Sequence, residues 1–392
     1  MNTTNLLIIC HAYTNFQKDP IEIIAPYVSS VNVFVRTNRF AEIGKFLPIS
    51  NLKHFSSKYK IDRRVIPKNI QVYSTPLWYI PTDCAYKKLG DSHYSHIRSV
   101  IKKNKIRFDL IHAHFTWSAG YAGARLKEEY GVPLVVTAHG YDIYSLPFKD
   151  VVWQEKIERV LNTADHIITV SQSNLKCIQK LDVSTPVTVI PNGFRSDLFY
   201  PRDMFECRRM LNLPQNKKII LTVGNLEPVK CQSYLIEAIR MIVQKRKDVL
   251  CVIVGSGTLK NTLACQIHHL GLEEYVLLVG GKSHDEISIW MNSCDIFVLP
   301  SINEGNPTVM FEALGCGKPF VGTKVGGVPE VISSDKYGLL VDPANIDDLA
   351  EKILTALDKE WDQKAILAYA EQFTWDNIAV DILKVYGRVL GR

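Results

Sequence analysis

Long hydrophobic segments are missing from this chain of 392 residues. The longest apolar runs are short, such as LLIIC at 6–10 and VIVG at 252–255, whereas a membrane-spanning helix needs roughly 20 apolar residues. The first residues, MNTTNLLIIC, also lack the basic start, long apolar segment and cleavage site of a signal peptide. We therefore expect a cytoplasmic protein that does not span a membrane.

Paired cysteines are missing as well. The nine cysteines include no Cys-x-x-Cys motif, which argues against zinc-binding patterns and a disulfide framework. Cys10, Cys251 and Cys294 lie in apolar strand-like segments, where a free cysteine behaves as a small hydrophobic residue. We expect a reducing compartment and no bound metal.

Acidic residues are scarce in one part of the chain. The net charge is +6, but residues 36–107 alone hold 16 basic and 4 acidic side chains. Such a block favours an anionic partner, which could be a membrane surface, a nucleic acid or a phosphate-bearing substrate. The alternative is a basic surface that only keeps the protein soluble.

Strand-like and helical segments alternate along the whole chain. A chain of this length usually exceeds one hydrophobic core, so two domains are expected. The β-α-β order predicts a mostly parallel sheet covered by helices in each domain. We predict an α/β protein with two Rossmann-like domains facing each other across a cleft, where ligands bind beyond the carboxyl ends of the strands.

The boundaries follow from the composition. We place the first domain at 1–194, a proline-rich polar linker at 195–214 and the second domain at 215–373. A last helix at 374–392, with Thr374 as its N-cap, is expected to return to the first domain.

Several strand ends carry candidate site residues. VIVGSGTLKNTL contains Gly255 but lacks the third glycine of a dinucleotide-binding motif, which favours a tight turn beside some nucleotide over an NAD site. HAH at 112–114 places two histidines on one face of a strand, where packing and hydrogen bonding are favoured over metal binding. His139, in TAHGYD, could bind a polar ligand, act in catalysis or be structural.

Lys230 follows the strand end VGN and lies near the start of the next helix. A lysine there opposes the helix dipole unless an anion shares the site. Phosphate binding and a solvated lysine are the two interpretations.

The segment INEGNPTVMFEALGCGKPF at 302–320 contains Glu304 and Glu312, separated by seven residues. Asn306 suits a helix N-cap and Pro307 the first helical turn. Backbone N–H groups at the start of this helix can hold an anion or sugar hydroxyl groups. The alternative is a capped amphipathic helix with two incidental acids.

In order along the chain, these segments resemble those of family 4 glycosyltransferases, which have the GT-B fold. The resemblance covers nearly the whole chain and rests on HAH, TAHGYD, IPNG, VGNLEPVK, VIVGSG, GKSHDEI, EGNPTVMFEA, GGVPEV and FTWDNIAVDIL. It implies a retaining transfer of a sugar from a nucleotide sugar, most simply a UDP- or GDP-sugar, with no metal or other cofactor.

The resemblance also implies roles for single residues. Lys230 matches the lysine that neutralises the diphosphate leaving group, Glu312 the acid that binds the nucleotide ribose, and His139 a histidine that contacts the donor sugar. His139, Lys230 and Glu304 are the catalytic candidates. The remaining donor-binding candidates are Gly224, Asn225, Gly255, Lys282, Gly305, Asn306, Pro307 and Thr308.

Two departures from the family pattern accompany the resemblance. Asn225 stands where the family usually has an arginine, and the loop after the first strand lacks the usual glycine pair. Asn15 or Lys18 could replace that pair in binding the acceptor.

These observations favour an enzyme of cell-surface polysaccharide or glycolipid synthesis with a sugar or lipid-linked acceptor. Peripheral contact with an anionic membrane is expected, and no nucleic acid. The alternatives are a non-catalytic GT-B protein that binds a sugar nucleotide or a partner, and a GT-B sugar-nucleotide epimerase.

Overall fold

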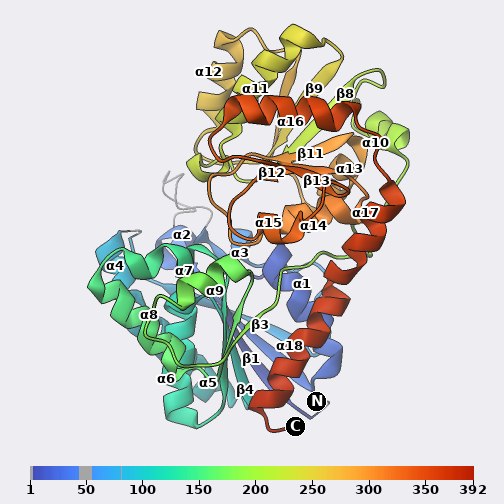
Figure 1. Ribbon diagram of the computed structural model, residues 1–392. Coiled ribbons are helices and arrows are strands. Elements are labelled where there is room, and N and C mark those ends of the chain that lie inside the picture. Colours follow the sequence, from blue (N-terminus) through green and yellow to red (C-terminus); the bar gives the residue numbers. More distant parts are fainter. Residues whose placement is uncertain (1–2, 44–54, 81) are drawn as a thin grey trace. The chain divides into compact units, whose positions relative to one another are not determined.

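The computed structural model describes residues 3–43, 55–80 and 82–392 (Figure 1). The chain divides into two compact units. The first comprises Met1–Pro191 and Ile378–Arg392, and the second Asn192–Asn377. The segment 195–214, expected to be a linker, lies in the second unit, where it contains helix α10 (Met204–Met210).

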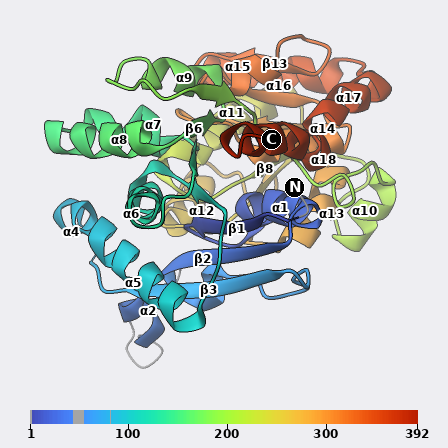
Figure 2. The ribbon, with the colours of Figure 1, turned by 90° about the horizontal axis from the view of Figure 1, so that it is seen from below.

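The first unit is built on a seven-stranded parallel sheet in the order β3-β2-β1-β4-β5-β6-β7. The strands are β1 (Asn5–Cys10), β2 (Ser30–Asn38), β3 (Ile70–Leu77), β4 (Leu110–His114), β5 (Leu134–Ala138), β6 (His166–Thr169) and β7 (Val187–Val189). The helices are α1 (Asn15–Ile24), α2 (Arg39–Ile43), α3 (Ser57–Lys60), α4 (Asp83–Lys87), α5 (Leu89–Asn104), α6 (Tyr121–Tyr130), α7 (Tyr141–Tyr144), α8 (Val151–Thr163) and α9 (Gln172–Ile178). Figure 2 shows β1, β2 and β3 side by side.

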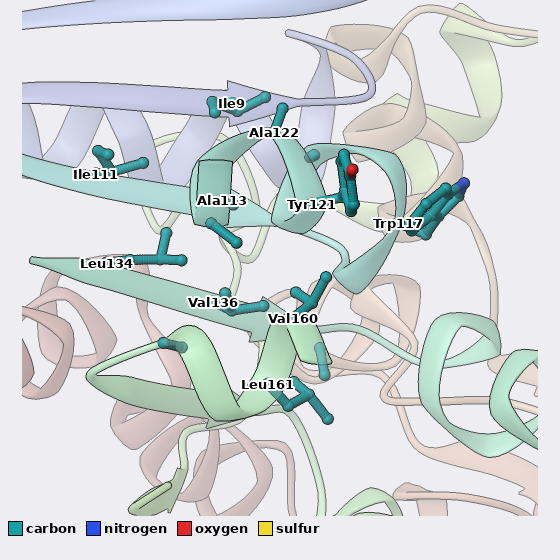
Figure 3. Packing of buried hydrophobic residues seen from close by; sticks show 14 of the residues in the cluster. Ile9, Ile111, Ala113, Trp117, Tyr121, Ala122, Leu134, Val136, Val160 and Leu161 are labelled. Atoms are coloured by element: carbon teal, nitrogen blue, oxygen red, sulfur yellow. The ribbon is translucent and has the colours of Figure 1, made fainter. Parts of the chain in front are cut away.

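The central strands are short apolar runs because helices cover both faces of a parallel sheet. β4 and β5 are buried over their full length. Figure 3 shows Val136 of β5 and Val160 of α8 in the same core, with the small Ala113 and Ala122 where β4 and α6 approach each other. Small side chains let a helix lie close to the sheet, so the run SAGYAGA suits this position.

The C-terminal helix α18 (Trp375–Val389) ends in the first unit, as predicted (Figure 1). Thr374 precedes it and its Oγ1 accepts a hydrogen bond from the Asn377 N–H at 3.4 Å, which confirms Thr374 as the N-cap. Tyr386 is buried on this helix and its hydroxyl group lies 2.6 Å from Nδ1 of His112 on β4.

The second unit contains a six-stranded parallel sheet in the order β10-β9-β8-β11-β12-β13. The strands are β8 (Lys218–Val223), β9 (Val249–Val254), β10 (Val276–Gly280), β11 (Ile296–Leu299), β12 (Phe320–Thr323) and β13 (Gly338–Val341). Besides α10, the helices are α11 (Gln232–Lys245), α12 (Lys260–His269), α13 (His284–Ser293), α14 (Thr308–Gly315), α15 (Val328–Val331), α16 (Ile346–Asp358) and α17 (Gln363–Ala370). The prediction of two Rossmann-like α/β units is therefore confirmed.

All nine cysteines are free thiols. Cys10, Cys251 and Cys294 are buried, as predicted, and burial raises the pKa of Cys10 and of Cys294 to about 12. In the described part of the chain, no helix has the length and apolar character needed to cross a membrane.

Candidate active site

The carboxyl ends of β8 and β11 form the centre of the candidate site in the second unit (Figure 1). These strands are neighbours in the sheet, although β9 and β10 lie between them in sequence. From β8 the chain adds strands toward one edge of the parallel sheet, and from β11 it adds them toward the other edge. The strand order thus reverses between β8 and β11, and ligands of open α/β sheets bind at such a reversal.

Lys230 and Glu304 form an ion pair at this point. Lys230 ends the 3-10 turn Pro228–Lys230 after β8, and its Nζ lies 2.5 Å from Oε1 of Glu304, which follows β11. The same oxygen accepts a hydrogen bond from Ser301 Oγ at 2.7 Å. Only 9% of the Glu304 side chain is exposed, against 23% for Lys230. The ammonium group thus retains access to solvent, while the carboxylate is held by two donors.

The glycines after β8 and β9 bring two turns into backbone contact. A Cβ atom at Gly255 would lie 1.9 Å from the carbonyl oxygen of Gly224, and one at Gly257 would lie 2.4 Å from that of Leu226. No side chain fits at either position. The tight turn predicted at Gly255 is therefore confirmed, and a nucleotide beside it stays a prediction.

The helix after Glu304 begins one residue later than predicted. α14 starts at Thr308 with Pro307 as its N-cap. The prediction of Asn306 as the N-cap is wrong because its Oδ1 accepts a hydrogen bond from the Asn192 backbone N–H at 2.9 Å, and its carbonyl oxygen accepts one from Asn192 Nδ2 at 2.7 Å. Proline has no N–H, so the first-turn donors come from Thr308 and Val309.

A second loop supports the Glu304–Gly305 backbone. Gly326 adopts a φ of 53°, and a Cβ atom there would lie 1.8 Å from the Glu304 carbonyl oxygen. Next to it, the Gly327 N–H donates to the Gly305 carbonyl oxygen at 2.8 Å. A glycine at position 326 is thus required to keep this loop in place, and Gly327 supports it through its backbone.

Glu312 lies on α14 and is buried. Its Oε1 is 3.1 Å from Nε2 of His284, the first residue of α13. His284 was not among the predicted site residues, although it lies within the segment GKSHDEI. The sequence feature that could have identified it is the capping box of Ser283 and Glu286. This motif marks His284 as the first residue of a helix that follows a strand. His284 orients Glu312 and occupies one of its oxygens.

The two other donor-site candidates of this unit are exposed. Lys282 lies 3.9 Å from Glu286 and 5.9 Å from the centre of the Trp290 ring. Asn225 contributes its carbonyl oxygen, which accepts a hydrogen bond from Gln232 Nε2 at 3.0 Å.

In the first unit, His139 follows β5 and belongs to a chain of imidazoles. Its Nε2 lies 3.0 Å from Nδ1 of His114. Asp142 holds the loop, since its two oxygens accept hydrogen bonds from the N–H groups of Thr116, His139 and Gly140 at 2.8, 3.1 and 2.8 Å. In the described part of the chain, His139 Nδ1 is buried without a hydrogen-bond partner. Ligand binding by His139 stays a prediction.

Burial controls the protonation of these histidines. It holds the pKa of His139 well below its usual range, with a further lowering from His114, and it lowers the pKa of His114 to about 4. Both rings are neutral near pH 7. His112 bonds Tyr386 on one side and Thr137 Oγ1, 2.7 Å away, on the other. The predicted packing and hydrogen bonding of the HAH pair is thus confirmed.

The acceptor-site candidates lie on α1. Lys18 is buried, and its Nζ bonds Asp62 Oδ2 at 2.9 Å and the Arg64 carbonyl oxygen at 3.2 Å, with Glu22 at 3.8 Å. Through these contacts, Lys18 holds α1 against the segment that follows α3. Asn15 begins α1, and its side chain lies outside the described residues. Within the described ranges, no group of three His, Cys, Asp or Glu side chains is arranged to hold a metal ion.

Two family models match large parts of this chain. Residues 203–373 match the family described as Glycosyl transferases group 1, and residues 56–198 match Glycosyltransferase Family 4. The putative teichuronic acid biosynthesis glycosyltransferase TuaC of Bacillus subtilis is 30% identical over 293 residues, which cover 74% of this chain and 71% of that protein. The D-inositol 3-phosphate glycosyltransferase of Mycolicibacterium smegmatis is 28% identical over 300 residues, or 72% and 68% of the two chains.

Solved structures share the fold. Sucrose-phosphate synthase of Thermosynechococcus elongatus superposes with a TM-score of 0.80 at 21% identity, covering 99% of both chains. Anabaena HepE in complex with UDP-glucose gives a TM-score of 0.75 at 23% identity, over 98% of this chain and 100% of that one. The protein is a glycosyltransferase with the GT-B fold. It belongs to glycosyltransferase family 4 and is a hexosyltransferase-type enzyme.

Proposed function

We propose that this enzyme transfers a sugar, with retention of anomeric configuration, from a nucleotide-diphosphate sugar to an acceptor in cell-surface polysaccharide or glycolipid synthesis. The observation that carries the proposal is the Lys230–Glu304 pair at the reversal between β8 and β11, next to the first turn of α14. A cation beside helix N–H groups suits a diphosphate.

The chemistry explains this combination of groups. Cleavage of the sugar–phosphate bond develops positive charge on the sugar and negative charge on the departing diphosphate. The Lys230 ammonium group and the Thr308 and Val309 N–H groups stabilise the diphosphate without a metal. A bound diphosphate competes with Glu304 for Lys230, which frees the carboxylate for the donor sugar. Glu312, oriented by His284, accepts hydrogen bonds from the ribose.

UDP-sugars are the first donors to test, because the fold neighbour HepE is described in complex with UDP-glucose. The name of TuaC, which refers to teichuronic acid biosynthesis, supports a polysaccharide acceptor. The positively charged region at 36–107 supports an acceptor that is anionic or lies at an anionic surface.

A nucleotide-release assay tests the proposal. The enzyme is incubated with UDP-, GDP- and ADP-sugars, with and without glycolipid extracts, and free nucleotide and the anomeric configuration of the product are measured. We expect one nucleotide to be released, an α-linked product from an α-linked donor, and a rate that EDTA does not change. An inverted product would refute retention, and a changed sugar formed without acceptor would indicate an epimerase.

Peripheral contact with an anionic membrane, on the inner face of the cell membrane, is also part of the proposal. Near the end of β3, Phe40, Trp78 and Ile80 are exposed by 39, 53 and 62%. The Phe40 and Trp78 rings lie 4.8 Å apart, and the Arg39 guanidinium lies 5.6 Å from the Trp78 ring. Aromatic side chains beside a cation suit the headgroup region of an anionic bilayer.

Vesicle sedimentation tests this contact. We expect binding to phosphatidylglycerol vesicles that fades at high salt and weakens several-fold in Trp78→Ser. Phe205→Ser, at a residue 52% exposed in the second unit, is the matched control and is expected to bind normally. Equal binding of the parent to neutral vesicles would contradict the electrostatic part of the proposal.

A further inference from the structure

A cationic cluster in the first unit takes no part in the mechanism above. It consists of Arg36 on β2, Lys60 at the end of α3, His11 after β1 and His93 on α5, and we call it the Arg36 cluster. Arg36 is only 6% exposed. A buried guanidinium group is unstable without compensating interactions, and arginine does not lose its charge in proteins.

The described partners of Arg36 are all neutral. Its Nη1 donates to Ser118 Oγ at 3.0 Å and to the Tyr86 hydroxyl group at 3.4 Å. The rings of Tyr79 and Tyr86 lie 5.8 and 5.3 Å from its guanidinium carbon. In the described part of the chain, Arg36 Nε is buried without a hydrogen-bond partner. Arg36 Nε is thus a hydrogen-bond donor that none of the described residues uses.

The histidines do not supply a countercharge. Thr75 Oγ1 donates to the Val35 carbonyl oxygen, so it accepts from His93 Nε2 at 3.4 Å, and His93 Nδ1 accepts from Ser118 Oγ at 3.0 Å. Burial, with a further lowering from Arg36, brings the pKa of His93 down to about 3. The ring is neutral and fixes the Ser118 hydroxyl group toward Arg36 as an acceptor.

Lys60 adds a second hydrogen-bond donor, which is positively charged when its amino group is protonated. Its Nζ donates to the Arg36 carbonyl oxygen at 3.2 Å. Burial and the nearby Arg36 charge lower the pKa of Lys60 to about 7. His11 completes this side, with its ring stacked on Phe115 at 4.4 Å and its Nε2 buried without a partner among the described atoms.

No carboxylate of the described residues pairs with Arg36 or Lys60. The acids nearest in sequence bond elsewhere: Glu42 accepts from the Ser57 N–H at 2.5 Å, and Asp62 accepts from Lys18 at 2.9 Å. Residues 44–54, outside the described ranges, contain no Asp or Glu in the sequence, so they offer no carboxylate side chain.

The cluster lies at the ligand-binding edge of its sheet. β2, β1 and β4 are neighbours, and the strand order in this parallel sheet reverses between β1 and β4. His11 and Phe115 directly follow these two strands, and Arg36 lies near the end of β2. His11, Lys60 and Tyr86 are partly exposed, so the cluster lies close to the surface of its unit.

We propose that the Arg36 cluster binds an oxyanion group of the acceptor, a phosphate or a carboxylate. That the anion belongs to the acceptor rests on the proposed function, whereas oxyanion binding rests only on the cluster. The anion accepts hydrogen bonds from Arg36 Nε, Lys60 Nζ and the His11 ring, and it supplies the missing negative charge.

Titration with inorganic phosphate tests the site directly. The measurements use the full-length Lys230→Gln variant, so that the donor site does not contribute, and follow binding by NMR line shifts. We expect saturable binding that Lys60→Gln weakens about tenfold or more, the usual effect of losing a charged hydrogen-bond donor. Lys58→Gln, at an exposed lysine of the same helix, is the matched control and should bind like its parent.

Arg36→Gln is the second variant, with circular dichroism to establish that it folds. The competitors glucuronate, glucose 1-phosphate and glucose separate a carboxylate from a phosphate ligand, and glucose should not compete. No saturable phosphate or glucuronate binding, or binding unchanged by Lys60→Gln, would overturn the proposal. Absence of turnover of any UDP-, GDP- or ADP-sugar by the unmodified enzyme would instead refute the proposed function, while this titration would still test oxyanion binding on its own.

Discussion

Lys230→Gln is expected to lower kcat by a factor of about a hundred to a thousand, the usual cost of removing one group that stabilises developing negative charge. Glutamine is one atom shorter and keeps a polar end group, but it removes the charge that offsets the departing diphosphate. Asn225 cannot compensate, because its amide side chain carries no charge. The rate of nucleotide release at saturating donor measures the effect.

Glu304→Gln and the double variant sharpen this experiment. The two side chains are in direct contact at 2.5 Å, so the double variant should be less impaired than the product of the two single effects predicts. Lys260→Gln, at an exposed lysine at the start of α12, is the control and should retain the parental rate. A Lys230→Gln enzyme within threefold of the parent would contradict the assignment of the donor site.

Asp295→Ala should lower the free energy of unfolding of the second unit by about 3–5 kcal/mol, because it leaves a buried cation unpaired. Only 3% of the Arg208 side chain is exposed, and its Nη2 lies 2.7 Å from Asp295 Oδ2. The same oxygen accepts a hydrogen bond from the Ile219 N–H at 2.6 Å, at the start of β8. The substitution thus also removes an anchor of the strand that leads to Lys230.

The chain has two units, so hydrogen exchange of the β8 and β11 amides should accompany urea denaturation and report on the second unit alone. Glu206→Ala removes the partner of Arg209 in a pair whose side chains are 66 and 68% exposed, and should change stability by less than about 1 kcal/mol. Arg208→Met combined with Asp295→Leu should recover most of the loss, since apolar replacement of both partners removes the unpaired charge. A loss below about 1 kcal/mol in Asp295→Ala would contradict the argument.

Local patterns predicted most of the regular structure. Helical patterns in the sequence predict helices near 151–163, 231–245 and 284–292, and the structure has α8, α11 and α13 there. These segments have regular apolar spacing, which survives in the folded protein. β3 escaped prediction because Pro76 lies within it, and a proline is tolerated there only because β3 is at the edge of the sheet. The position of a strand in its sheet is not a local property.

The residues of the candidate site likewise divide into those that local sequence predicts and those that depend on distant contacts. The residue types at the strand ends, such as Lys230, Glu304 and His139, are visible in the sequence because polar groups follow short apolar runs. The N-cap assignment of Asn306 failed because Asn192, 114 positions away, takes its side chain. His284 was missed because its partner Glu312 is 28 positions further on.

The two α/β units and the polar residues at the ends of their strands follow from the order of apolar runs, glycines and charges along the chain. The contact between Lys230 and Glu304, 74 positions apart, does not, because it depends on β8 and β11 being neighbours in the sheet. Nor does the unpaired charge of Arg36, since a basic residue in a basic segment looks like ordinary surface until folding buries it without an acid. Strand order and burial are set by packing between distant segments, and they decided which charges meet and which are left for a ligand.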